Sequence, residues 1–94
     1  MHKSEVIEVL AARNGITLTA AEKFVNSFIK LVYEELHSGR VVNISGFGKF
    51  EVSHRKPREG VNPRTGERIV IPELNVGKFR AGEAMKKFIN QQNN

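Results

Sequence analysis

Residues 46–65, GFGKFEVSHRKPREGVNPRT, contain the change of pattern that decides the fold. Apolar and polar residues alternate as far as Val52, with the period of a half-buried β-strand. The following segment, residues 53–72, has hardly any apolar residues before Ile69, so no core can form around it. Its basic residues are Arg55, Lys56, Arg58, Arg64 and Arg68. We therefore predict a strand that runs into a basic arm projecting from the body.

The far end of this arm carries strong turn signals. The sequence Asn62-Pro63-Arg64-Thr65-Gly66 combines residues that favour tight turns. Residues 67–74 then predict a returning strand, with Ile69 and Ile71 on one face. Residues 53–74 are accordingly interpreted as a long two-stranded ribbon together with its return strand.

The strand that enters the arm is predicted to begin as one half of a β-hairpin over residues 40–52. Val42 and Ile44 alternate with polar residues on the first strand, before the turn Gly46-Phe47-Gly48. We expect both glycines to adopt positive φ in this tight turn.

The first 39 residues have helical rather than strand periodicity. Ser4 is a predicted N-cap, and Gly15 is expected to end the first helix. A second helix is predicted to start at Thr17 or Thr19, where Thr19 and Glu22 match a capping box. One apolar stripe then runs through Ala21, Phe24, Val25, Phe28, Val32 and Leu36 to the helix end at Gly39. The two helices predict an αα-hairpin.

The apolar stripe is wider than one short partner helix can cover, because Ile29 and Leu31 extend it. Dimerisation would bury the surplus; the alternative is a monomer in which the later strands cover it. Residues 75–94 are predicted to return to the core at Val76 and Phe79 and to form a short helix after Gly82. The apolar side of this helix comprises Ala84, Met85, Phe88 and Ile89, and residues 91–94 are expected to fray.

Charge is distributed unevenly along the 94 residues, whose net charge is +5. Residues 1–39 contain four basic and five acidic side chains, whereas residues 40–94 contain eleven and five. A basic half joined to a near-neutral half indicates a polyanionic partner, either nucleic acid or an anionic membrane surface. The length predicts a single domain.

Several classes of site and location are disfavoured by composition. The chain lacks cysteine, which excludes disulfides and cysteine-based zinc sites. His2, His37 and His54 lack metal-ligand spacing, and no nucleophile is paired with a base, so we expect no enzyme, metal, cofactor or small-molecule substrate. No apolar run approaches a membrane span and no secretory signal is visible, which predicts a cytoplasmic protein.

The order of elements and the run from Gly46 to Thr65 resemble the HU and integration host factor family along essentially the whole chain. The pattern is G-F-x-x-F-x-x-x-x-R-x-x-R-x-G-x-N-P-x-T. Its fixed positions are Gly46, Phe47, Phe50, Arg55, Arg58, Gly60, Asn62, Pro63 and Thr65. The resemblance implies an α+β fold: an intertwined dimer with an α-helical base, an antiparallel β-sheet saddle and two protruding β-ribbon arms.

The same resemblance implies a non-enzymatic protein of the bacterial nucleoid, whose arms wrap the minor groove of double-stranded DNA and bend it. Predicted DNA contacts are Lys3, Ser45, Gly46, Arg55, Lys56, Arg58, Asn62, Pro63, Arg64, Thr65, Arg68, Lys78, Arg80 and Lys86. Pro63 is expected to intercalate between base pairs; without the resemblance, a simple turn proline would be favoured. The predicted dimer core comprises Phe28, Val32, Ile44, Phe47, Phe50 and Phe79.

Three positions depart from the family pattern: Val61 and Ser53 lack the charge of many relatives, and Glu83 replaces a frequent lysine. These departures predict weaker flanking contacts. Alternatives that the sequence leaves open are a site-preferring DNA-bending subunit and a basic module for RNA, an anionic membrane or a protein. Homodimer and heterodimer are both compatible with it.

Overall fold

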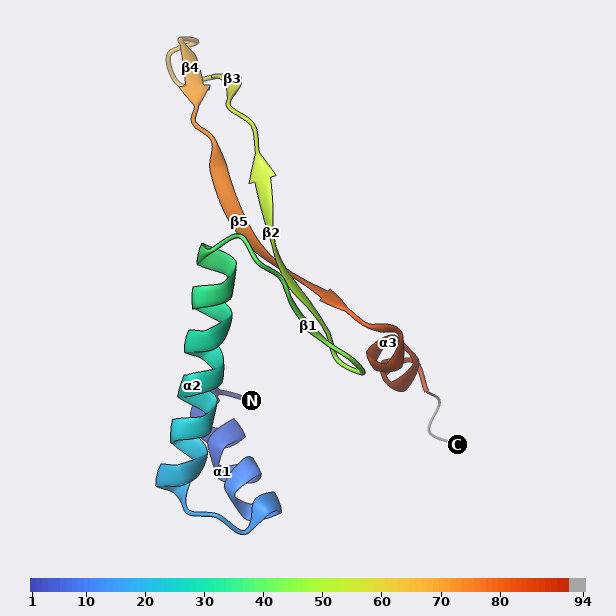
Figure 1. Cartoon of the computed structure of the whole chain (residues 1–94). Helices are drawn as coiled ribbons and strands as arrows, with labels where there is room; N and C mark the ends of the chain where they lie inside the picture. The colour runs from blue at the N-terminus through green and yellow to red at the C-terminus, as the bar shows by residue number, and fades with distance from the viewer. Residues whose placement is uncertain (92–94) are drawn as a thin grey trace.

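The computed structural model describes residues 1–91, so most of the segment expected to fray, residues 92–94, lies outside the described residues. Helices α1 (Lys3–Asn14) and α2 (Leu18–His37) precede strands β1 (Val42–Ile44) and β2 (Gly48–Arg55). Strands β3 (Arg58–Val61), β4 (Arg68–Ile71) and β5 (Leu74–Ala81) follow, and then helix α3 (Glu83–Ile89). The strands form a three-stranded sheet, β1-β2-β5, and a two-stranded ribbon, β3-β4. Figure 1 shows this ribbon extending the sheet away from the helices, as the predicted α+β fold requires.

Helix α1 begins earlier than its predicted cap, whereas α2 begins at Thr17, one of its two predicted starts. The N-cap of α1 is His2, whose backbone N–H donates to the Glu5 carboxylate at 3.3 Å, so the prediction of Ser4 was wrong. The N-cap of α2 is Thr17, whose hydroxyl accepts from the Ala20 N–H at 3.1 Å. Thr19 therefore lies inside the helix, and the predicted capping box at Thr19 is wrong, because Thr17 already accepts a bond from the first turn.

Helix α1 closes where predicted, whereas α2 ends at His37, two residues before the predicted Gly39. Gly15 ends α1 in the left-handed region, at φ 61°, as predicted. After α2 the backbone N–H of Arg40 donates to the Glu35 carbonyl at 2.9 Å. The Arg40 guanidinium also contacts both carboxylate oxygens of Glu35, at 2.6 and 3.4 Å. This hydrogen bond lowers the pKa of Glu35 from its ordinary value and raises that of Arg40, and it ties the end of α2 to the chain entering β1.

The hairpin at residues 40–52 is confirmed, with Val42 opposite Phe50 and Ile44 opposite Gly48. Gly46 has the expected positive φ of 83°, but Gly48 does not, so that half of the prediction was wrong. Gly48 is instead required by packing: a Cβ there would lie 2.5 Å from Cζ of Phe79.

The predicted return strand over residues 67–74 is divided in two. Strands β2 and β5 pair over their full lengths, from Gly48 opposite Ala81 to Arg55 opposite Leu74. The ladder then stops, and β3 and β4 pair separately in the ribbon. Pro57 and Pro72 lie in the two interruptions, where a proline cannot donate a ladder hydrogen bond. The hairpin strand thus continues past the predicted limit at residue 52.

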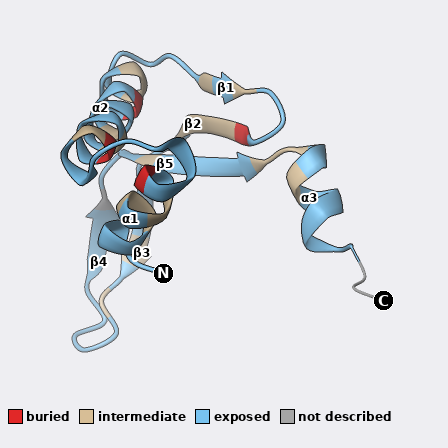
Figure 2. Ribbon diagram, turned by 90° about the horizontal axis from the view of Figure 1, so that it is seen from below, coloured by how far each residue is buried: buried red, intermediate tan, exposed pale blue. Residues whose placement is uncertain are grey.

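The fully buried part of the core is small. Among the described side chains, the buried apolar residues are Ala11, Ala21 and Val32, and most of the ribbon in Figure 2 is coloured as exposed. The predicted surplus apolar face is confirmed, because Phe24 and Leu31 on α2 are 71% and 51% exposed. The alternative, in which the strands of the same chain cover this face, is wrong. Helix α3 lies apart from α1 and α2 in both views, with Phe88 77% exposed.

Candidate nucleic-acid interface

The arm places five cations along a ribbon that has no core beneath it. Arg55 ends β2, Lys56 lies in the break, Arg58 begins β3, Arg64 lies in the tip and Arg68 begins β4. All five are exposed, and none forms an ion pair with another residue of the described range 1–91. Their charges are therefore available to a polyanion.

The tip of the arm is a closed turn built around Asn62. The Asn62 side-chain oxygen accepts from the Arg64 N–H at 2.9 Å, and its carbonyl accepts from the Gly66 N–H at 2.8 Å. Gly66 has a φ of 73°, and the Thr65 hydroxyl accepts from the Glu67 N–H at 3.3 Å. Asn62 and Thr65, predicted as DNA contacts, thus hold the turn together. This turn leaves Pro63 exposed at the outermost end of the arm.

The three-stranded sheet has a second cationic surface on the face that points away from α2. Phe50 and Phe79 are cross-strand neighbours, and the Phe50 ring meets Phe28 of α2, with the centroids 6.3 Å apart. Because side chains alternate across a strand, the next register pairs, Lys49 opposite Arg80 and Glu51 opposite Lys78, lie on the other face. We call this surface, formed by Lys49, Glu51, Lys78 and Arg80, the outer face.

The remaining predicted contacts are spread more widely. Ser45 and Gly46 lie exposed in the β1–β2 turn, at the end of the sheet remote from the arm. The adjoining Phe47 carbonyl accepts from the Gly82 N–H at 3.0 Å, which joins this turn to the start of α3, the helix that carries Lys86. Lys3 begins α1 in the helical base and is not brought to the arm (Figure 1).

The aromatic residues predicted for a dimer core do come together. Phe47 and Phe50 each lie close to Phe79, with centroids 5.2 and 4.9 Å apart, and Phe28 meets Phe50 edge to face. Ile44 is half-buried on β1, and Val32 is buried on α2. The cluster remains open to solvent within one chain, since Phe28, Phe47 and Phe79 are about 40% exposed, at 42%, 41% and 39%.

The family-level comparison rests on nearly the whole chain. The sequence model described as bacterial DNA-binding protein matches residues 1–90. The chain belongs to this family, which is of the HU and integration host factor type. DNA-binding protein HU-beta 2 of Neisseria meningitidis is 40% identical, covering 96% of this chain and 99% of its own. DNA-binding protein HU of Lactococcus lactis is 45% identical, covering 90% and 93%.

Solved structures of HU proteins match the fold as well. The Anabaena HU–DNA cocrystal structure has a TM-score of 0.89 and 33% identity, covering 98% of this chain and all of the other. HU from Thermotoga maritima has a TM-score of 0.70 at 26% identity, covering 96% and 100%. This HU-type chain therefore shares both the sequence family and the α+β fold of DNA-binding proteins that are not enzymes.

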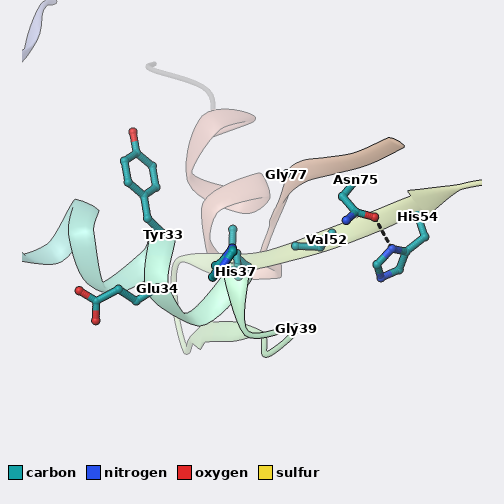
Figure 3. Close-up of a pocket in the computed structure, with 9 residues that line it drawn as sticks. Tyr33, Glu34, His37, Gly39, Val52, His54, Asn75 and Gly77 are labelled. Atoms are coloured by element: carbon teal, nitrogen blue, oxygen red, sulfur yellow. Dashed lines mark hydrogen bonds between the residues drawn. The ribbon is translucent and has the colours of Figure 1, made fainter. Parts of the chain in front are cut away.

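A hollow of about 620 Å³ lies between α2 and the sheet, and residues of α2, β2 and β5 line it. His37 of α2 and His54 of β2 both line it, although they are distant in sequence. In Figure 3 the His54 ring points toward Asn75 across the β2–β5 pair, with Nδ1 and Oδ1 2.5 Å apart. Within residues 1–91 no three His, Cys, Asp or Glu side chains gather as metal ligands, and no helix could span a membrane.

Sequence reasoning missed two residues of this candidate interface. Lys49 and Glu51 lie on the outer face with Lys78 and Arg80, yet only the latter two were predicted. The alternation of apolar and polar residues around Phe50 and Val52 could have predicted the two missed residues, because it assigns residues 49 and 51 to the face opposite the aromatic cluster. The cross-strand neighbours of these residues depend on the register of β5, which the sequence pattern did not specify.

Proposed function

We propose that this protein binds the minor groove of duplex DNA largely without sequence preference, bends it and thereby compacts the bacterial nucleoid. The observation that carries this proposal is the arm, whose five exposed cations form no ion pair within residues 1–91 and lie on a ribbon without a core. A ribbon of alternating side chains fits along a groove, with cations near the phosphates on either side. The Anabaena relative, which was crystallised with DNA, supports the same ligand.

Binding through phosphates has a measurable consequence. Each neutralised phosphate releases counterions, so the affinity falls linearly with salt on logarithmic scales. If two arms and the body together make on the order of six to ten such contacts, affinity falls by roughly three to five decades between about 50 and 200 mM salt. This salt dependence comes from phosphate contacts and does not require recognition of base edges.

Pro63 is the proposed wedge that bends the duplex. It is exposed at the end of the arm, and the Asn62 hydrogen bonds at 2.8 and 2.9 Å fix the turn that presents it. An apolar ring inserted at a base step unstacks it, and the bent duplex then contacts more protein surface. Asn62 and Thr65 act in this proposal as the frame of the wedge.

A second copy of the chain is the proposed cover for the open aromatic cluster and for the exposed face of α2. Phe24, Phe28 and Tyr33 expose 71%, 42% and 70% of their surface, and exposed apolar patches of this kind mark protein–protein contacts. A dimer would bury it and would carry two arms on one body. Sedimentation at several protein concentrations tests this, and a monomer that stays folded at all of them would contradict it.

RNA recognition is the less favoured function. Single-stranded RNA is commonly bound by exposed aromatic rings that stack on bases. Here Phe50 and Phe79 face α2, and the opposite face presents charged side chains, as does the arm. A site-preferring bending protein would use the same surfaces, so sequence preference has to be measured.

The test is a titration of the full chain with a nicked duplex, an intact duplex of unrelated sequence and an RNA hairpin at matched salt. Fluorophores at the duplex ends report bending. We expect both duplexes to bind and bend, the RNA hairpin to bind more weakly, and all affinities to fall with salt. Preference for the RNA hairpin, or binding without a change in end-to-end distance, would contradict the proposed function.

A further inference from the structure

Glu51 is the only acidic residue in the described three-stranded sheet, and it lies in the middle of the outer face. Its neighbours across the strands and along β2 are cations: Lys78 opposite it, Lys49 two positions before it, and Arg80 diagonal to it. A carboxylate at this position is unexpected on a surface proposed to approach phosphates, because it repels them.

Both oxygens of this carboxylate are engaged. Glu51 Oε1 lies 2.8 Å from Nε of Arg80, and Oε2 lies 3.6 Å from Nζ of Lys49. The Glu51 side chain is 22% exposed, against 65% for Arg80 and 43% for Lys49. The carboxylate is thus less exposed to solvent than either of the two cations that contact it.

This network differs from the arm, where the cations have no partner within the described residues. A phosphate that approaches the body meets two cations already neutralised in part by one anion. Contact then requires the phosphate to compete with the carboxylate, whereas contact with the arm requires no such exchange.

We propose that Glu51 sets the strength of the body contact with DNA by withholding Arg80 and Lys49 from the phosphates. The inference rests on the proposed function and deepens it, because it assigns the affinity mainly to the arms. Glu51 then determines what share of the binding free energy comes from contacts between the DNA and the body. Because only a bent duplex reaches the body, this share sets how strongly a bent duplex is favoured over a straight one.

The same geometry allows an opposite role, in which Glu51 positions Arg80. The closest contact uses Nε, and an arginine oriented in this way can still offer its terminal guanidinium nitrogens to a phosphate. Glu51→Gln separates the two roles, because the amide keeps an acceptor for Nε but removes the charge. Loss of the charge strengthens binding if Glu51 restrains the cations, and weakens it if the charge is needed to orient Arg80.

The experiment measures duplex affinity against salt for the full-length wild type, Glu51→Gln, Arg80→Ala and the double variant. We expect Glu51→Gln to bind about fivefold more tightly at low salt, and the logarithmic salt slope to steepen by about one as a further cation reaches a phosphate. In the Arg80→Ala background this gain should fall by at least half. Glu22→Gln, the same charge change on exposed residue 22 of α2, is the matched control and should alter affinity by less than about twofold.

Thermal unfolding verifies that each variant is folded, and Glu51→Thr serves as a second neutral residue suited to a strand if the glutamine variant is not. Unchanged or weaker binding by a folded neutral variant would overturn the inference while leaving the proposed function intact. A gain equal to that of Glu22→Gln would also overturn it, since net charge alone would then be responsible. Failure of the wild type to bind duplex DNA would instead refute the proposed function, and the inference would fall with it.

Discussion

The ring of Phe79 closes over the α carbon of Gly48, so that a Cβ at residue 48 would lie 2.5 Å from Cζ of the ring and 2.5 Å from the Arg80 carbonyl oxygen. Gly48 is the buried residue of β2, and Phe79 contacts both Phe47 and Phe50 in the aromatic cluster. Glycine at residue 48 thus allows the Phe79 ring to pack directly against the backbone of β2.

Gly48→Ala should therefore destabilise the fold. The ring and a backbone carbonyl must both move to admit the methyl group, which costs about 1–3 kcal/mol. Gly77→Ala is the matched control, because residue 77 lies in the paired strand with nothing within 4 Å of an added Cβ. Urea unfolding at fixed protein concentration measures both, and equal losses of stability would refute the packing argument.

Pro63→Ala should separate binding from bending. The arm cations remain, so much of the affinity should persist, while the rigid apolar wedge at the tip is lost. Energy transfer between the ends of a duplex measures the bend at saturating protein. Pro72→Ala, which changes a proline in the break between β4 and β5, should leave the bend unchanged. A full bend with the Pro63 variant would eliminate the wedge.

The Glu35–Arg40 pair should make stability depend on acid pH. The hydrogen bond from Arg40 lowers the pKa of Glu35 below its usual value near 4.5. A carboxyl whose folded pKa is depressed contributes stability that is present above its unfolded pKa and is lost as the pH falls through the folded value. Thermal unfolding should show Glu35→Gln less stable than the wild type at neutral pH, with the difference vanishing in acid. A difference that persists below the folded pKa would point to packing rather than charge.

Much of the fold could be predicted from local patterns. The change from helical to two-residue periodicity after Gly39 indicated the hairpin, and the basic run after Ser53 indicated an arm without a core. Helix starts were less accurate, because several residues near each start could act as caps. His2 and Thr17 occupy those positions, where sequence preference alone favoured Ser4 and left Thr19 as an alternative.

The rest depends on partners that are distant in sequence. The reason for a glycine at residue 48 lies in Phe79, which is brought over it by the β2–β5 register. The same register surrounds Glu51 with cations, and it places Pro57 and Pro72 in the break between the pairs Arg55–Leu74 and Arg58–Ile71. Local periodicity assigns a residue to a face of a strand but does not supply its neighbours on the next strand.

The arm as the principal DNA contact is tested most directly by the affinity of Arg55→Ala combined with Arg58→Ala for two duplexes of unrelated sequence, measured across a range of salt concentrations. The matched control is Lys23→Ala combined with Lys30→Ala, which removes the same charge from α2. We expect the arginine variant to lose at least about tenfold in affinity for both duplexes alike, with a shallower salt slope, and the lysine variant to lose much less. An arginine variant that binds as tightly as the wild type, or no worse than the lysine variant, would contradict this account.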